Sequence, residues 1–420
     1  MLLRVLGGRA PAARWRGRAA PTVSPPRTVL PLRGWADNDF AGAELTLRRA
    51  LGSACVISET MLTAFRLQAG GCRLFGSPLY ADLLDAALQD LQANGPVARL
   101  VEDFADDPLR AFIALRVLGS VHERVLAGEA PALARHYPTA NGRPEWPGVW
   151  HAFRDVVAEQ REALLPRLAS FPQTNEVRRC AGLLGGFLHV ARASGLPLRL
   201  REMGTSAGLN LGWDRYHYTL APHVWGDPRS PVRIDAEWHE GAAAFEQRPA
   251  IESRAGCDIA PVRIEDPMQA RRLEAYIWAD QPERLTELRA AIALARANPP
   301  RIERESARVW LERELREPAE GVATVVFHSA VWAYLDAAEQ AEVRALLHAA
   351  GARARSRAPF AWLSHEDEGG YGRITVRLRL WPGGQSLALA EGHPHGRSVR
   401  WGEPPPGSER DPITKGDLGT

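Results

Sequence analysis

The chain has 420 residues, of which 45% are hydrophobic and 24% charged, with a formal net charge of +2. This length fits about two or three domains, and the composition excludes disordered, collagen-like and coiled-coil classes. No stretch approaches the roughly 18 apolar residues of a membrane span, so no membrane partner is expected. The four cysteines include no C-x-x-C pair, which favours a cytoplasmic protein with free thiols over a disulfide framework or zinc site.

The basic residues are almost all arginine, because Lys415 is the only lysine. Codon bias in a GC-rich genome explains this better than selection for phosphate binding. Seven arginines precede the first acidic residue, Asp37, and without them acidic residues outnumber basic ones by five. The chain after residue 36 therefore carries a net negative charge and has no general attraction for nucleic acid. We expect a small-molecule partner instead.

The first part of the chain is predicted to be an extension followed by an all-α domain. Residues 1–36 contain no acidic residue, which suits a disordered extension or an early start codon, with a targeting segment as the alternative. Over residues 37–195, apolar residues recur at helical spacing. The expected helices are 79–91, 108–126, 151–168 and 175–193.

From residue 196 onward, short apolar strands alternate with helices. The alternation predicts an α/β domain with a mainly parallel sheet over 196–402. Residues 211–250 are rich in Trp, Tyr and Pro and suggest an inserted hairpin or lid, and 403–420 a disordered tail. The expected strands are 197–203, 251–258, 301–305, 323–328, 359–364 and 374–380, with helices at 282–297, 307–315 and 337–350.

The most informative segment is the turn that follows the strand 197–203. Glu202 lies near the end of this strand, and Gly204, Ser206 and Gly208 then place small side chains at alternate positions. Small residues let a ligand approach the backbone, and we expect the turn to open a helix whose free N–H groups face that ligand.

This turn resembles the first motif of class I S-adenosylmethionine-dependent methyltransferases, with Ser206 in place of the middle glycine. The resemblance implies a Rossmann-like, methyltransferase-type domain with S-adenosylmethionine as its cofactor. The implied cofactor-binding residues of the turn are Glu202, Gly204, Ser206, Gly208 and Asn210.

The resemblance continues down the chain in the order of the family's strands. It implies that Asp258, at the end of the next strand, bonds the ribose hydroxyls and that Glu305 faces the adenine. His328 ends the following strand, where it could act as a general base. A structural histidine there is an equally good interpretation.

Several polar and aromatic residues are candidates for the substrate pocket. Trp213, Arg215 and Tyr216 could stack on a planar substrate, since interleaved aromatic and arginine residues suit such contacts. His393 and His395 lie on alternate residues of a loop. Their hydrogen bonding to backbone or substrate is favoured over metal binding, which needs further ligands at suitable spacing, so no metal site is predicted.

Two other functions are compatible with the same turn. Residues 204–208 also match G-x-S-x-G, the nucleophile elbow of α/β-hydrolases, which would make Ser206 a nucleophile with Asp367 and His393 or His395 as partners. The helical region before the turn lacks the strands and oxyanion donors that a hydrolase needs. A Rossmann-like ligand-binding or interaction protein without catalytic activity is the third alternative.

A closer likeness covers most of the chain but names no reaction. Over about 40–402 the sequence resembles a bacterial domain-of-unknown-function family. The phrases that carry this likeness include 207–211, 213–216, 225–228, 327–329 and 393–396.

Overall fold

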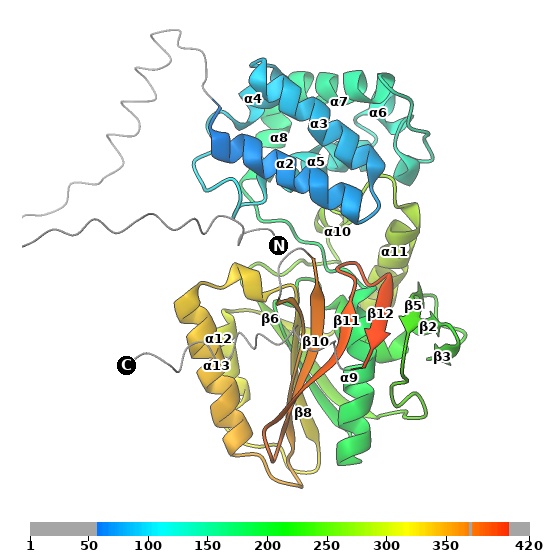
Figure 1. The fold of residues 1–420 in the computed structure, drawn as a ribbon, viewed down its shortest axis with the longest axis vertical. Helices are drawn as coiled ribbons and strands as arrows, with labels where there is room; N and C mark the ends of the chain where they lie inside the picture. Colours follow the sequence, from blue (N-terminus) through cyan, green and yellow to red (C-terminus); the bar gives the residue numbers. More distant parts are fainter. Residues whose placement is uncertain (1–56, 369–371, 403–420) are drawn as a thin grey trace, which may run out of the picture.

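The computed structural model describes residues 57–368 and 372–402. The predicted extension 1–36 and tail 403–420 lie outside these residues. A helical part lies at one end of the molecule, and a part built on a nine-stranded sheet lies at the other (Figure 1). The predicted mixed α/β fold, with an N-terminal helical region and a large, mostly parallel sheet, is confirmed.

The helical part has a hydrophobic core of its own, which includes the fully buried Phe65 and Val117. Two of the helices predicted for this part differ in extent, and the one expected at 108–126 begins only at Ile113. The stretch 151–168 divides at Gln160, whose side chain accepts from Arg124 Nε at 2.7 Å and donates to the carbonyl of Glu129 at 2.8 Å. The helices are α2 (Glu59–Leu74), α3 (Pro78–Gln92), α4 (Pro96–Val101), α5 (Ile113–Leu126), α6 (Pro131–Ala134), α7 (Gly148–Glu159) and α8 (Arg161–Leu168).

The large sheet has the strand order β5-β12-β11-β10-β9-β8-β1-β6-β7. The five strands from β9 to β7 are parallel, and β10 and β11 continue the sheet as antiparallel neighbours. The strands are β1 (Leu198–Met203), β5 (Glu237–His239), β6 (Ile251–Asp258), β7 (Arg301–Arg304), β8 (Ala323–Ser329), β9 (Phe360–Asp367), β10 (Ile374–Trp381), β11 (Gln385–Gly392) and β12 (Ser398–Trp401).

Helices cover both faces of the sheet, as its alternating side chains require. Val325 and Phe327 of β8 join the core beneath α9 (Arg179–Ser194) and α11 (Pro282–Ala297). Val326 joins the opposite core with α12 (Ala307–Glu314) and α13 (Ala337–Ala352). The boundary predicted at residue 195 falls after α9, a helix that packs on the sheet (Figure 1).

The inserted segment 211–250 contributes to the core of the sheet part. It forms a three-stranded sheet of β2 (His217–Leu220), β3 (His223–Trp225) and β4 (Arg233–Asp235), and β5 extends the large sheet by pairing with β12. Trp213, one of its three tryptophans, is fully buried. The segment contains the antiparallel hairpin of β2 and β3, and its buried side chains join the core of the sheet part.

The strand order reverses at β1, which lies between β8 and β6. In open parallel sheets, ligands bind in the crevice at the carboxyl ends of the strands, at such a reversal. The turn singled out in the sequence leaves β1 at this edge. Within the described residues, no helix has the length and apolarity needed to cross a membrane.

Candidate functional site at the carboxyl edge of the sheet

The turn after β1 adopts a backbone that favours glycine. The φ angles are +62° at Gly204, +54° at Ser206 and +73° at Gly208. A Cβ at Gly204 would meet the side chain of Val331, so the turn packs closely on the loop after β8. The helix expected after the turn is the short 3₁₀ helix η2 (Leu209–Arg215) and not an α-helix. The inserted segment begins there and leads the chain away from the sheet.

Three N–H groups in and directly after the turn are bonded to side chains of the protein. Asp258 Oδ2 accepts the N–H of Ser206 at 2.9 Å. Asn175 Oδ1 accepts those of Ala207 at 3.2 Å and Leu209 at 3.1 Å. A ligand that used these donors would have to replace the two side chains.

Glu202 supplies a buried carboxyl group beneath the turn. Burial raises its pKa to about 8, nearby Asp258 adds to the rise, and a hydrogen bond from the Thr205 hydroxyl and the charge of Arg179 oppose it. A carboxyl with this pKa is largely protonated at neutral pH, so it can donate as well as accept a hydrogen bond.

The other predicted cofactor residues, Asp258, Glu305 and Asn210, lie on or beside three different elements around the turn. Asp258 ends β6 beside the turn and also accepts the N–H of Ala260 at 2.8 Å. Glu305 follows β7, and its carboxylate accepts the N–H of Ser306 at 2.9 Å. Asn210 is buried against α9, where its Oδ1 accepts from Cys180 Sγ at 3.3 Å. The structure thus brings Glu202, Ser206 and Asp258 together, while Asn210 contacts the helix.

His328 belongs to a buried cluster at the ends of β8 and β9. Its Nδ1 lies 2.7 Å from Glu366 Oε1. The indole of Trp362 donates to its Nε2 at 3.0 Å. Since an indole only donates, Nε2 is the acceptor and Nδ1 carries the proton. Both ring nitrogens are engaged, so a substrate proton can reach Nε2 only if Trp362 moves.

The three aromatic and arginine candidates of the insertion separate into core and surface positions. Trp213 stacks on Phe187 with ring centroids 4.4 Å apart, and both rings are fully buried. The hydroxyl of Tyr216 donates to the carbonyl of Leu209. Arg215 alone reaches the surface.

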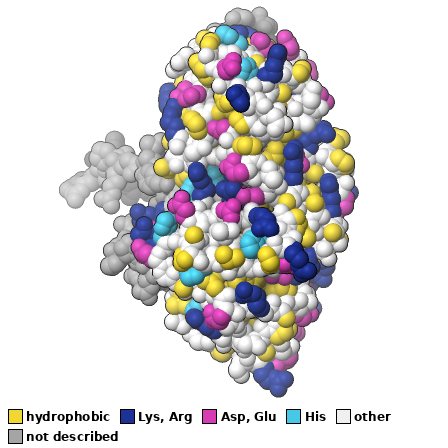
Figure 2. Space-filling model, turned by 90° about the vertical axis from the view of Figure 1, so that its right-hand side faces the viewer, with side chains coloured by type: hydrophobic (Ala, Val, Ile, Leu, Met, Phe, Trp, Pro, Cys, Tyr) yellow, Lys and Arg dark blue, Asp and Glu magenta, His cyan; other side chains and the backbone are white. Residues whose placement is uncertain are grey.

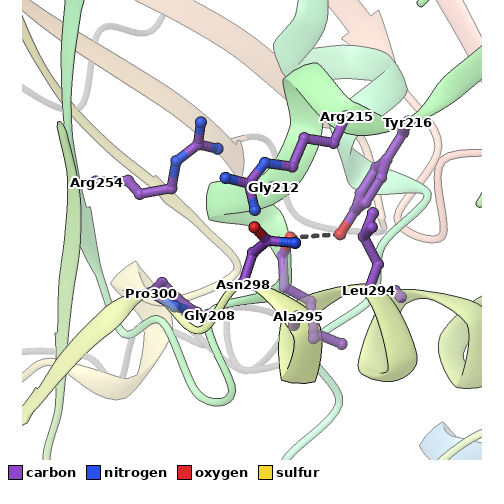
Figure 3. Close-up of a pocket in the computed structure, with 11 residues that line it drawn as sticks. Gly208, Gly212, Arg215, Tyr216, Arg254, Leu294, Ala295, Asn298 and Pro300 are labelled. Carbon is purple, nitrogen blue, oxygen red and sulfur yellow. Dashed lines mark hydrogen bonds between the residues drawn. The ribbon is translucent and has the colours of Figure 1, made fainter. Parts of the chain in front are cut away.

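Arg215 borders a small pocket between η2, β6 and the end of α11. The pocket is shallow and lies beside Gly208 and Asn298. Figure 3 shows the guanidinium groups of Arg215 and Arg254 on the same side of it. Arg254 is paired with Asp214 at 2.7 Å, so the pocket carries one arginine charge without an ion pair among the described residues.

His393 and His395 lie in the loop between β11 and β12, at the junction with the helical part. Their rings lie 5.3 and 5.8 Å from that of Phe75, and His395 also lies edge-on to Trp278. Burial and neighbouring arginines lower the pKa of His393 to about 4. Throughout the described part of the chain, no group of three His, Cys, Asp or Glu residues could hold a metal ion.

Arg179, the first residue of α9, is a site residue that the sequence did not indicate. Its Nε donates to the carbonyl of Pro394 at 3.1 Å and its Nη1 to that of Ser329 at 3.4 Å. It has no ion pair with the other described residues. Basic, acidic and histidine side chains gather at mid-height of one face of the molecule (Figure 2). In an arginine-rich chain, no sequence signal distinguishes this arginine from the rest.

The nucleophile-elbow interpretation of residues 204–208 lacks a base. Ser206 Oγ is buried, and it has no hydrogen-bond partner in the described residues. The predicted partner His393 instead accepts the N–H of His395 at 3.0 Å. A serine nucleophile needs a base within hydrogen-bond reach, so this geometry supports the hydrolase least.

Comparison with known proteins assigns a family but no activity. An α/β fold with a buried polar edge is shared by many enzymes and binding proteins, so the fold alone defines only a broad class. The chain belongs to the family DUF2332, described as an uncharacterized protein conserved in bacteria, whose model matches residues 63–401. This confirms the expected membership of a bacterial domain-of-unknown-function family. No curated protein matches the chain.

Proposed function

We propose that this chain is an S-adenosylmethionine-dependent methyltransferase of Rossmann-like type that acts on a small-molecule acceptor. The observation that carries the proposal is the position of the glycine turn: it leaves the central strand β1 where the strand order reverses. The carboxyl groups of Glu202 and Asp258 lie at the ends of adjacent strands beside it.

The residues of the turn have the chemistry that such a ligand needs. Glu202, largely protonated, can donate to or accept from the amino-acid end of the ligand. Asp258 can transfer its hydrogen bonds from Ser206 and Ala260 to ribose hydroxyls. Asn175 would then release the N–H groups of Ala207 and Leu209, because the bound ligand takes over its place.

The chain's contribution to the reaction would be positioning. A sulfonium methyl group is already reactive, and holding an acceptor in line with it supplies much of the rate. His328, fixed by Glu366 and Trp362, is the candidate base for the acceptor proton. It can act in this way once the Trp362 indole leaves Nε2.

Calorimetric titration of the full chain with S-adenosylmethionine tests the proposal. We expect saturable binding that weakens at least about tenfold in Glu202→Gln, which corresponds to about 1.4 kcal/mol. Glu312→Gln, on the exposed face of α12, is the matched control and should bind as the wild type does. An intact chain that gives no saturable heat, and whose melting temperature the donor does not raise, would refute the proposal.

A second measurement distinguishes an active methyltransferase from a protein that binds S-adenosylmethionine without catalysing a reaction. Transfer of a labelled methyl group to small molecules of a bacterial extract measures turnover directly. Donor binding with no transfer to any acceptor would leave a ligand-binding protein in place of an enzyme.

A further inference from the structure

Arg116 is a buried guanidinium that lacks a counter-ion. It lies on α5 of the helical part and is 1% exposed. Its Nη1 donates to the carbonyl of Leu168, while Nε and Nη2 have no partner within 57–368 and 372–402. No carboxylate in those ranges forms an ion pair with it. Burying an unpaired charge costs several kcal/mol, so proteins rarely retain one without a reason.

Two aromatic rings lie over this guanidinium, and the nearer one belongs to Phe171. The ring of Phe171, in the loop between α8 and α9, lies 4.5 Å from Arg116 Cζ. Phe171 is itself 49% exposed, which is unusual for a large apolar side chain. Phe104 lies farther away, at 5.6 Å. Rotation of the Phe171 side chain would therefore open Arg116 to a ligand.

Phe171 belongs to an aromatic patch that joins the helical part to the edge of the sheet. The ring of Tyr334 lies 6.1 Å from that of Phe171 and 5.5 Å from that of Phe112. Tyr334 belongs to η3 (Trp332–Tyr334), directly after β8, and is 48% exposed. Two exposed aromatic side chains from separate segments, with the half-buried Phe112 beside them, indicate a binding surface.

The patch also connects Arg116 with the proposed reaction site. Two residues of the segment that leads to Tyr334 contact that site: the N–H of Val331 donates to Glu366 Oε1 at 2.9 Å, and the ring of Trp332 stacks on that of His328 at 5.3 Å. Glu366 is the residue that holds His328. A molecule resting on Tyr334 would thus lie between the unpaired Arg116 and the cluster at the end of β8.

We infer that this junction binds a small molecule with an oxyanion group, a carboxylate or a phosphate, on an aromatic body. The oxyanion pairs with Nε and Nη2 of Arg116 in the two-pronged geometry that guanidinium groups favour. The aromatic body takes the place of the Phe171 ring and packs on Phe112 and Tyr334. The inference deepens the proposed function, because it names the class of the methyl acceptor, but the binding itself does not require the donor.

The test uses the full chain and matched probes in the absence of S-adenosylmethionine. The probes are 2-naphthoate, 2-naphthyl phosphate and the neutral 2-naphthamide, titrated calorimetrically at constant ionic strength. We expect at least one of the two anions to bind at least about tenfold more tightly than the amide. Which anion binds more tightly identifies the oxyanion. The preference should vanish in Arg116→Met and persist in Arg110→Met, an exposed arginine in the turn just before α5.

The stability of the ligand-free variant distinguishes a binding group from a structural one. Removal of an unpaired buried charge should leave the melting temperature of Arg116→Met equal to or above that of the wild type. If this variant does not fold, Arg116→Lys replaces it, and the anion preference should fall at least about threefold there. Equal binding of anions and amide by the wild type, or a preference that survives the Arg116 substitution, overturns the inference. Failure of the donor to bind would instead count only against the proposed function.

Discussion

Asn175 is hydrogen-bonded to Leu209, because its side-chain oxygen accepts the N–H of that residue at 3.1 Å. The same oxygen accepts the N–H of Ala207. One side chain from the loop before α9 thus holds the turn after β1, across 34 residues of sequence.

Replacing Asn175 with Ala should destabilise the ligand-free protein by about 2 kcal/mol, because two buried N–H groups lose their acceptor. Urea unfolding of the full chain measures this change. Asn298→Ala, at an exposed position after α11, is the control and should change the free energy of unfolding by less than about 0.5 kcal/mol. An Asn175 variant as stable as this control would show that the hydrogen bonds from Asn175 do not stabilise the turn.

The Glu202 carboxyl should make the stability of the protein depend on pH. Its pKa in the folded state, about 8, lies above the ordinary value of 4.5. The folded state therefore keeps a proton that the unfolded state has released, and stability falls as pH rises from about 4.5 to 8. Relative to Glu202→Gln, the wild type should lose stability on the order of a few kcal/mol over this range. Unfolding curves of both proteins at several pH values measure the difference, and parallel curves would contradict it.

His365 should act in the opposite direction. It is buried, neither ring nitrogen has a partner among the described residues, and burial lowers its pKa to about 3. The unfolded state takes up a proton below its ordinary pKa of 6.5 while the folded state does not, so stability is lost as pH falls from about 6.5 towards 3. His365→Phe should remove this loss. It should also leave stability at pH 7.5 unchanged or higher, because a buried imidazole without partners is replaced by an apolar ring. Destabilisation by more than about 1 kcal/mol at pH 7.5 would reveal a partner of the imidazole.

Ser206 should not react with a serine-directed probe. Its hydroxyl has no base within reach, so a fluorophosphonate should label the full chain no faster than a Ser206→Ala variant. Ser206→Gly should raise stability slightly, by up to about 1 kcal/mol, since glycine adopts the φ of +54° without strain. Labelling that depends on Ser206 would restore the hydrolase interpretation.

The alternation of strands and helices was readable from the sequence because buried parallel strands are short, continuous apolar runs. Residues 251–258 and 374–380 form strands within a residue of the predicted bounds. The last two strands of the sheet, β11 and β12, were missed. Residues of β11 such as Gln385 and Ser386 are polar, and the antiparallel edge that they form is only partly buried.

The polar contacts of the site were less predictable than the fold. Glu202, Ser206 and Asp258 could be grouped because each follows or ends a strand, and such ends meet at one edge. The expected helix 175–193 starts at Asn175, but α9 begins only at Arg179 and the asparagine bonds the turn instead. Trp213 was assigned to a substrate pocket because a buried indole and a ligand-facing one have the same local sequence.

The pairing of β12 with both β11 and β5 has a consequence for synthesis on the ribosome. Among the described residues, β5 forms its strand pairing in the large sheet only with β12, residues 398–401. During translation, about 160 further residues must therefore be synthesised after β5 before β12 is available to pair with it. A nascent chain stopped before residue 398 would expose two unpaired sheet margins, which makes it a candidate for chaperone binding.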